Sequence, residues 1–479
     1  MKAGAAALAL LVLAGGGAFV FARPEEEDPP SPGAARATEP VRRPAPRVTA
    51  RSVMTHVRAL QRVAARHDGN RAAGTPGARA SVSYVAAKLR AAGYRVRLEP
   101  VRFASFDEEG RPRLRGGGVS AKRIGRLRTL AYSGSGRARA RVAPVDLDLS
   151  PGLPSGSDSG CERSDFARFP RGRIALIQRG ECSLKSKVLG AQRAGASGVV
   201  ILNGGQIGRR GVVSGTLGTP GARIPAVSVS YRAGAALSRA RGPVSLAVRA
   251  SSEWRTTDNV VADSPFGGGG GRVMLGGHLD SVAEGPGAND NASGAGAVLA
   301  IAEREAAEAP DSHRPLRVAL WGAEELGLQG SRGHVQRLTE SERREITAYV
   351  NLDMVGSANG GRFVYGSGQP AVGPLEAVAR RVLDRRGKPA RERPLGAGSD
   401  HTPFERAGVP VFGLFSGALG LKSADQSRDW GGRAGQPYDR CYHRRCDRAE
   451  RIDRRTLDDL SRTAAAVVAT ALDPRKAGR

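Results

Sequence analysis

The chain has 479 residues, 40% of them hydrophobic, and a formal net charge of +28. This length allows a full buried core and predicts two domains. The basic residues are mostly arginines spread through every segment without a long basic run, and this pattern argues against a specific nucleic-acid site. The charge does predict nonspecific adhesion to acidic cell-surface polymer, because a positive surface attracts polyanions.

The N-terminus has the pattern of an export signal. Lys2 precedes an apolar run from Ala3 to Ala22 that ends in a small residue suited to cleavage, so residues 1–22 are predicted to be a signal peptide. An apolar run of this length almost spans a bilayer, and an uncleaved anchor is the alternative. Both interpretations predict a secreted or extracytoplasmic protein. Residues 23–46 are rich in proline, glutamate and arginine and are predicted to be a disordered linker.

Two helices and a strand are predicted to open the folded part of the chain. Apolar residues recur at helical spacing from Val48 to Arg66 and from Ser81 to Ala92, and the segment from Tyr94 to Val101 alternates like a strand. We assign residues 47–105 to the first half of a discontinuous main domain, whose second half is residues 251–473.

An insert, residues 106–250, separates the two halves. It has a strand, helix, strand rhythm without a cluster of histidines or carboxylates suited to catalysis. The segment resembles the protease-associated (PA) domain at these residues: Cys161, Asp165-Phe166, Arg179-Gly180, Cys182, Lys187 and Ala194-Gly195-Ala196. The resemblance implies a β-rich, non-catalytic module near a peptidase active site. An α/β domain of unrelated role is the alternative.

The four cysteines are an even number in a chain that is predicted to be exported, which indicates two disulfides. Proximity in the sequence favours Cys161 with Cys182 and Cys441 with Cys446. Other pairings remain open at this point.

The second half of the main domain alternates predicted strands with helices. Buried strands are expected at 273–275, 316–321, 348–352 and 409–415. This alternation predicts an α/β fold with a mixed, mostly parallel central sheet and helices on both faces. Polar side chains come just beyond these strands, at the edge where open α/β sheets carry their chemistry. They are His278 and Asp280, Glu324 and Glu325, and Asp353.

These residues, with Asp290 and His443, have the composition of a two-zinc site. Two zinc ions about 4 Å apart need a bridging carboxylate, and one imidazole and one carboxylate for each ion. One assignment fits: Asp290 bridges, His278 and Asp353 hold one zinc, and Glu325 and His443 hold the other. Each residue alone has an ordinary explanation, such as a helix cap or a packed loop histidine. A shared site explains all of them together.

The remaining polar residues have expected roles in catalysis. Glu324 is left without a metal beside a ligand, so we expect it to act as general base. Tyr442 could donate its hydroxyl to the oxyanion that forms when a carbonyl is attacked. Asp280 lies two residues from His278 on the same face of an extended segment, and we expect its carboxylate to hydrogen-bond the imidazole and fix its tautomer.

Residues 47–105 and 250–470 resemble the secreted bacterial di-zinc aminopeptidases. The matching stretches are Gly69-Asn70-Arg71-Ala72, His278-Leu279-Asp280-Ser281-Val282, Asn289-Asp290-Asn291, Trp321 to Leu328, Asp353-Met354, Ser399-Asp400-His401, Trp430-Gly431-Gly432 and Cys441-Tyr442-His443. The resemblance implies the zinc exopeptidase fold, the same roles for the site residues, and a last zinc ligand, His443, inside a small disulfide loop. It also implies that Asp400 and His401 lie near the substrate pocket without binding metal.

Two positions depart from that family. Its arginine before the Ser-Asp-His motif is Gly398 here, and one of two aspartates of its calcium site is Arg462, while Asp458 matches the other. Calcium is therefore a doubtful second cofactor beside two zinc ions. The expected activity is removal of the N-terminal residue of peptides, with a preference for apolar side chains. The alternatives are a carboxypeptidase or aminoacylase on the same scaffold, and an inactive cationic binding protein.

Overall fold

The computed structural model describes residues 47–149, 157–308, 314–366, 368–396 and 398–475. The predicted signal peptide and linker lie outside this range. None of the described helices has both the length and the apolarity that a bilayer crossing requires.

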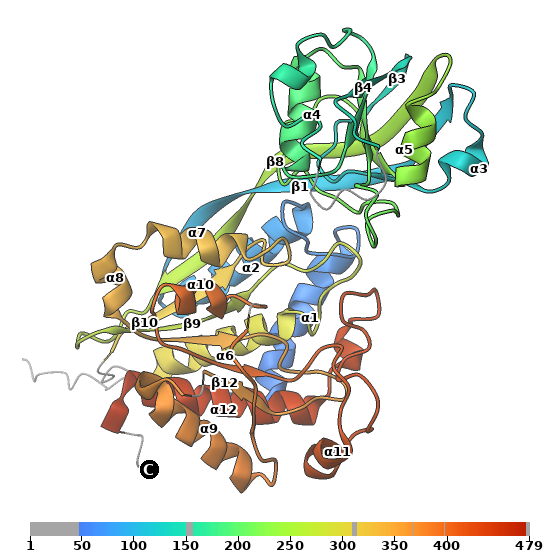
Figure 1. Cartoon of the computed structure of the whole chain (residues 1–479). Coiled ribbons are helices and arrows are strands. Elements are labelled where there is room, and N and C mark those ends of the chain that lie inside the picture. The colour runs from blue at the N-terminus through green and yellow to red at the C-terminus, as the bar shows by residue number, and fades with distance from the viewer. Residues whose placement is uncertain (1–46, 150–156, 309–313, 367, 397, 476–479) are drawn as a thin grey trace, which may run out of the picture. The chain divides into compact units, whose positions relative to one another are not determined.

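A nine-stranded mixed sheet forms the centre of the main domain (Figure 1). Its order is β1-β8-β10-β9-β11-β14-β12-β13, and β3 pairs with β8 outside this path. The middle strands β10, β9, β11 and β14 are parallel, whereas β8 and β12 join them in antiparallel orientation. The bounds are β1 Arg95–Gly116, β3 Gly136–Ala140, β8 Val244–Asp263, β9 Arg272–His278, β10 Leu316–Trp321, β11 Ile346–Leu352, β12 Phe363–Tyr365, β13 Arg391–Glu392 and β14 Val411–Phe415. The predicted mixed α/β class is confirmed.

Helices cover both faces of this sheet because its strands are apolar on both faces. Along β10, Leu316, Val318 and Leu320 pack into one core, and Ala319 and Trp321 pack into the other. The larger core includes residues of α1 Ala50–Ala65, α2 Pro76–Ala91, α6 Ala292–Glu308, α9 Gly373–Arg385 and α12 Arg454–Leu472. The smaller core includes residues of α7 Gln329–Arg337 and α10 His401–Arg406. Two further short helices are α8 Glu340–Glu345 and α11 Ala424–Trp430.

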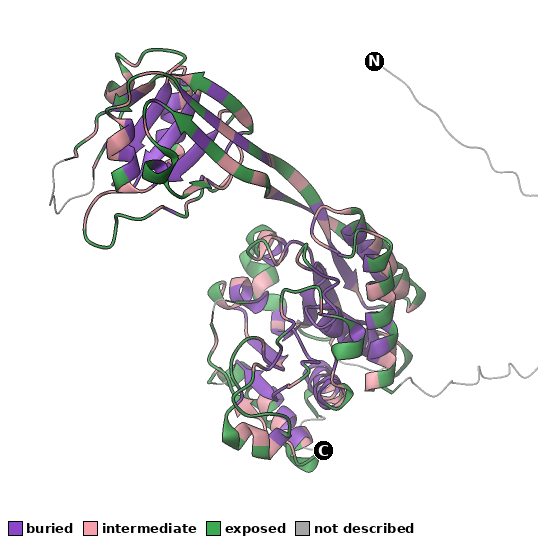
Figure 2. Cartoon of the chain, turned by 90° about the vertical axis from the view of Figure 1, so that its right-hand side faces the viewer, coloured by how far each residue is buried: buried purple, intermediate pink, exposed green. Residues whose placement is uncertain are grey.

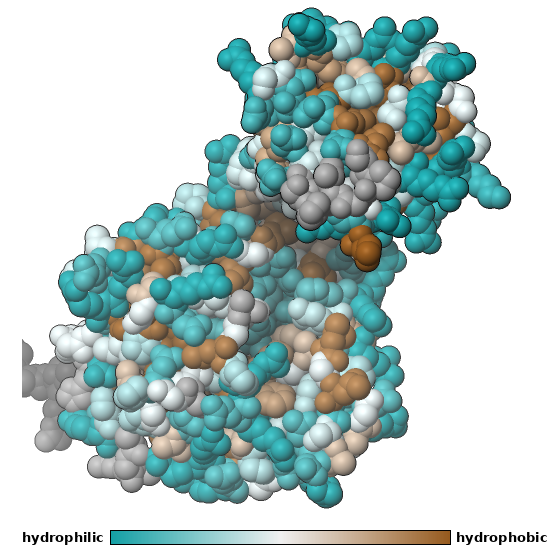
Figure 3. All heavy atoms as spheres, in the orientation of Figure 1, coloured by the Kyte–Doolittle hydropathy of each residue, from teal (hydrophilic) through white to brown (hydrophobic). Residues whose placement is uncertain are grey.

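Burial follows the same layers. In Figure 2 the central strands are almost wholly buried, whereas the outer sides of the helices are exposed. The face drawn in Figure 3 is mainly hydrophilic, with apolar side chains in small scattered groups. The apolar residues therefore serve mainly to build the core that supports the sheet edge.

The insert has its own five-stranded sheet, in the order β2-β7-β6-β5-β4. Its elements are β2 Leu127–Thr129, β4 Val142–Val145, β5 Ile174–Gln178, β6 Gly198–Leu202, β7 Ala226–Val229, α3 Ala121–Ile124, α4 Leu184–Arg193 and α5 Tyr231–Leu237. The strands β1 and β8 enter and leave the insert as one long antiparallel pair, from Arg95↔Asp263 to Gly116↔Val244. This is longer than the strand predicted to end at Val101.

Both expected disulfides are present. Cys161 bonds to Cys182, and Cys441 bonds to Cys446. The second bond closes the short loop that contains His443.

An aspartate at the end of β8 ties four strands of the central sheet together. The carboxylate of Asp263 accepts hydrogen bonds from Arg272 (2.7 Å), from Arg317 (2.7 and 3.0 Å) and from Arg97 (3.1 Å). Burial alone would raise the pKa of Asp263, but the hydrogen bond and charge of Arg317 and the charges of the other two arginines outweigh it and lower that pKa.

We expect Asp263→Asn to lower the free energy of unfolding by about 1 kcal/mol at pH 7, since the cluster is partly exposed. Because folding lowers this pKa, the carboxylate stabilises the fold fully above about pH 4, the unfolded value, and that contribution is lost as the pH falls through the lower folded value. Urea unfolding at several pH values measures this, with the difference from wild type shrinking below about pH 4. Asp425→Asn, at an exposed residue, is the matched control and should change little; a gap that widens in acid would contradict the assignment.

Candidate active site

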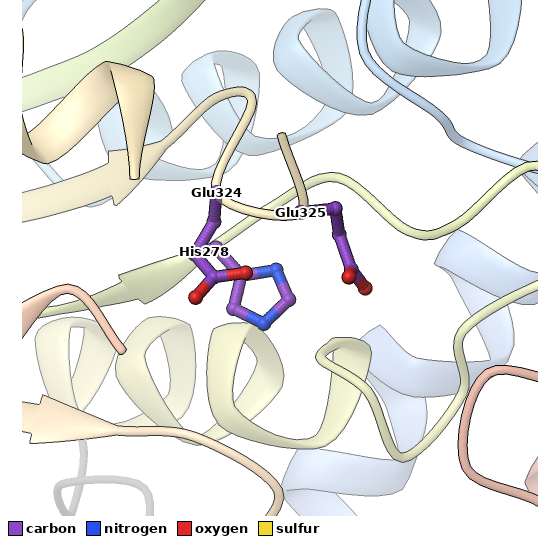
Figure 4. Close-up of side chains that lie close together, drawn as sticks. All are labelled: His278, Glu324 and Glu325. Carbon is purple, nitrogen blue, oxygen red and sulfur yellow. The ribbon is translucent and has the colours of Figure 1, made fainter. Parts of the chain in front are cut away.

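The polar residues predicted from the strand ends meet at one edge of the sheet. His278 is the last residue of β9, Asp353 follows β11, and Glu324 and Glu325 lie in the loop after β10. Asp290 precedes α6, and His443 comes from the distant disulfide loop. In Figure 4 both glutamates leave their loop toward the side on which the His278 imidazole lies.

Two sets of possible metal ligands share Asp290. His278 Nε2 is 3.1 Å from Asp290 Oδ1 and 3.3 Å from Asp353 Oδ1. His443 Nε2 is 3.2 Å from Asp290 Oδ2 and 3.0 Å from Glu325 Oε2. Within each set the ligand atoms lie within 4.8 Å of one another. Asp290 therefore directs one oxygen to each histidine, as a bridging carboxylate does.

Glu324 stands apart from both sets. Together with His278 and Glu325 it forms a third cluster of possible ligand atoms. However, each of the two other sets already has an imidazole and two carboxylates without it. Glu324 is thus close to the shared centre and free for another role.

The orientation of His278 leaves its Nε2 free to bind a cation. Its Nδ1 lies 3.2 Å from the backbone carbonyl oxygen of Asp280 and 3.7 Å from the Asp280 carboxylate. An Nδ1–H that donates to this carbonyl leaves a lone pair on Nε2. The Asp280 carboxylate, which we expected to hydrogen-bond the imidazole, is thus farther from Nδ1 than the backbone carbonyl of the same residue. Asp280 Oδ1 instead accepts a hydrogen bond from the backbone N–H of Glu324 (3.1 Å) and so links the two loops.

The acidic groups at this edge fit a site for cations. Among the described residues, buried oxygens of Asp290, Glu325 and Asp353 have no hydrogen-bond donor. Burial and the charge of Asp290 raise the pKa of Glu325 to about 7, and burial raises that of Glu324 well above its usual value. So many close carboxylates disfavour one another's ionisation, and divalent cations would relieve that repulsion. Carboxylate and imidazole ligands in this arrangement suit zinc.

Buried groups that the sequence did not single out hold the ligand loops. Asp447 accepts hydrogen bonds from the backbone N–H groups of Asn289 (2.7 Å) and Asp290 (3.0 Å). The Asn289 side chain donates to Asp439 and to Ser357. Asp447 directly follows Cys446, and that position is the only signal the sequence offered for it.

Arg71, within one of the family-like stretches, supports the loop between His278 and Asp290. Its guanidinium is fully buried and donates to the carbonyl oxygens of Pro286 (3.0 Å), Gly287 (2.8 Å) and Leu279. Burial lowers its pKa to about 10, so it stays charged at neutral pH.

The Ser399-Asp400-His401 motif lies beside the ligands. Ser399 donates to Asp353 Oδ2 (2.7 Å), whereas Asp400 and His401 belong to none of the candidate metal clusters in the described chain. His401 Nε2 faces the carbonyl oxygen of Gly396 (3.1 Å).

His401, Asp353 and Gly398 line a pocket of about 340 Å³. Its walls also include Tyr365, Phe415 and Leu395.

Tyr442 stacks on His443, with ring centroids 3.8 Å apart. Burial and the charges of nearby carboxylates raise its pKa, so its hydroxyl remains a hydrogen-bond donor at neutral pH. His443 itself has a positive φ of 57°, as do Ala323 (57°) beside Glu324 and Met354 (52°) beside Asp353. Non-glycine residues rarely adopt this conformation, and its concentration here points to a functional site.

The position expected for calcium contains positive charge instead. Asp458 accepts hydrogen bonds from Arg462 (2.7 Å) and Arg386 (2.9 Å). Two guanidinium groups on this carboxylate disfavour a cation there.

Comparisons with known proteins agree with this geometry. Residues 259–468 match the model of peptidase family M28, and residues 145–237 match the PA domain. An aminopeptidase of Pseudomonas aeruginosa is 40% identical over 423 residues, which cover 85% of this chain and 78% of that protein. A probable lipoprotein aminopeptidase of Mycobacterium tuberculosis is 37% identical over 429 residues, 86% of this chain and 82% of that protein.

A solved structure extends this similarity to three dimensions. The zinc aminopeptidase of Bacillus subtilis matches with a TM-score of 0.54 and 25% identity, over 90% of this chain and 97% of that one. The 40% and 37% sequence identity to the two aminopeptidases, over most of the chain, is higher than a shared fold alone requires. The chain therefore belongs to peptidase family M28 and carries an inserted PA domain.

Proposed function

We propose that this protein is an exported di-zinc aminopeptidase that removes the N-terminal residue of peptides, with a preference for apolar side chains. The observation that carries the proposal is the pair of ligand sets that share Asp290 and leave Glu324 free. The similarity to an aminopeptidase of Pseudomonas aeruginosa and to the zinc aminopeptidase of Bacillus subtilis supports it.

His278 and Asp353 would hold one zinc, Glu325 and His443 the other, and Asp290 both. When bound, the zinc ions supply Lewis acidity, which lowers the pKa of water at the site and polarises the peptide carbonyl. Asp280 would hold the loops of His278 and Glu324 in position through its hydrogen bond with the backbone N–H of Glu324.

Glu324 would take a proton from the attacking water and pass it to the leaving amine. Tyr442 would donate its hydroxyl to the carbonyl oxygen as negative charge develops there. Glu324 and Asp353 would hold the free amino group of the substrate, because both carboxylates face the centre. The neighbouring pocket, with Tyr365, Phe415 and Leu395 in its walls, would receive an apolar N-terminal side chain.

We also propose the domain division and the location of the protein. Residues 106–250 would be the insert, and residues 47–105 with 251–473 the peptidase domain. The two disulfides and the apolar residues 1–22 support an extracytoplasmic location.

Purified protein supplied with zinc should release p-nitroaniline from leucine p-nitroanilide and lose this activity when a chelator removes the metal. N-acetyl-leucine p-nitroanilide is the matched control, since it lacks the free amine that Glu324 and Asp353 would hold. If the free-amino anilide is not hydrolysed, release of acetate from N-acetyl-leucine would favour an aminoacylase, and release of C-terminal residues from peptides would favour a carboxypeptidase. No turnover of any aminoacyl anilide would contradict the proposal.

A further inference from the structure

The strands β1, β8 and β3 present a row of arginines on one face. Arg113 and Arg137 are the cross-strand neighbours of Ala247, one on each side of β8, and Arg115 and Arg139 are the neighbours of Ser245. Same-face residues of a strand lie about 7 Å apart, and β1 and β3 lie about 10 Å apart across β8. The small residues of β8 thus form a floor between two walls of arginine.

This pattern follows from the strand period. The alternate residues Leu114, Ala138, Leu246 and Val248 are buried in the core of the insert. Their neighbours must point outward. The segments of β1 and β8 in Figure 2 show this change between buried and exposed residues along the ribbon.

The result is an open groove of about 760 Å³ with a single sign of charge. Six exposed arginines line it: Arg111, Arg113, Arg115, Arg137, Arg139 and Arg249. No acidic residue of the described chain lines the groove, and within that same part of the chain none of the six arginines forms an ion pair with a carboxylate. Six unpaired guanidiniums this close repel one another, so an anionic ligand would be strongly favoured there.

We propose that this arginine groove is a binding site for a linear phosphate-bearing polymer. A guanidinium binds phosphate oxygens through two parallel hydrogen bonds, and two walls of guanidiniums suit a chain laid along β8. No aromatic side chain lines the groove, so it has no platform on which the bases of a single-stranded nucleic acid could stack. Its only large apolar lining residue within the described chain, Leu246, is buried, so the groove presents no exposed large apolar side chain that could insert into a membrane surface.

This site is independent of the peptidase chemistry. It would hold the enzyme at an acidic polymer and so localise an activity that resides elsewhere in the chain. It also differs from the general attraction expected from a net charge of +28, because it depends on the arginines of this groove rather than on the total charge.

The test compares two variants of the full-length protein that lose equal charge. The groove variant is R113Q/R115Q/R137Q/R139Q. The control variant is R126Q/R128Q/R232Q/R239Q, which removes four exposed arginines of the insert outside the groove. Binding to labelled linear inorganic polyphosphate is measured between about 50 and 200 mM salt, with leucine p-nitroanilide turnover and thermal unfolding as measures of folding.

The groove variant should bind at least about tenfold more weakly and lose up to about four units of slope in a plot of log affinity against log salt. The control variant should change less than about threefold. Equal losses in both variants would show that only net charge matters and would overturn the proposal. Binding of wild type to acidic phospholipid vesicles but not to polyphosphate would also overturn it, in favour of a membrane surface. Neither result depends on whether the anilide is hydrolysed.

Discussion

Glu324→Gln is expected to lower turnover of leucine p-nitroanilide by about 100- to 10,000-fold, the usual contribution of a general base. The amide has the shape of the carboxylate but cannot accept the proton of the attacking water. The zinc content of the Glu324→Gln variant should equal that of wild type, because each zinc would keep an imidazole and a carboxylate and would share Asp290.

The zinc content decides between the two roles that the geometry allows Glu324. It lies near enough to His278 and Glu325 to be a third ligand. If the variant loses both zinc and activity, Glu324 is a ligand, and if it keeps full activity, another group is the base. Glu340→Gln, an exposed residue of α8 that is paired with Arg344, is the matched control and should retain both zinc and activity.

Asp290→Asn is expected to have the second large effect, because both histidines face this one carboxylate. An amide nitrogen toward either His278 or His443 would replace a lone pair with a donor. We expect zinc affinity to fall by more than about 100-fold and activity to fall to background.

Asp400→Asn is the matched control for this loss. Asp400 is also fully buried, and burial raises its pKa to about 7, yet it belongs to neither ligand set. Zinc content measured by mass spectrometry should therefore stay normal in Asp400→Asn and fall in Asp290→Asn. A normal zinc content in Asp290→Asn would rule out the bridge, and a loss in Asp400→Asn would mean that the ligand set is wrong.

The sequence predicted the central strands well because each is a short apolar run with a polar residue within the next three positions. The predicted strand 316–321 coincides with β10 Leu316–Trp321. By contrast, α2 begins at Pro76, earlier than the predicted Ser81. The sequence did contain the signals of this start, since Thr75 caps the helix and proline is typical of the first helical position. Here the apolar period misled, since the first turn contains Gly77 and Ala78 instead of large apolar residues.

The long pair β1 and β8 could not be predicted in full for a different reason. Beyond Phe106 the strand contains Asp107, Glu108, Glu109 and Gly110, and its pairing shifts register there. Such a polar segment is typical of a loop, and only its pairing with β8 keeps it extended. The arginine groove could not be predicted either, because it forms only when β1 and β3 pair with β8, which lies far from both in the sequence.

The residues of the candidate site could be predicted from the sequence, but the hydrogen bonds that hold their loops in place could not. Strand ends of a parallel sheet meet at one edge, so His278, Glu325 and Asp353 could be grouped from the sequence. The hydrogen bonds from Asn289 and Asp290 to Asp447 join residues that are 158 and 157 positions apart, and no local pattern encodes them.

The central claim is that these side chains hold two zinc ions at one edge of the sheet. Anomalous diffraction at the zinc edge from crystals of the zinc-loaded protein tests it most directly. We predict two peaks about 3.5–4 Å apart, one beside His278 and Asp353, the other beside Glu325 and His443, with Asp290 between them. A single peak, or zinc bound by His401 or Asp400 instead, would contradict the account.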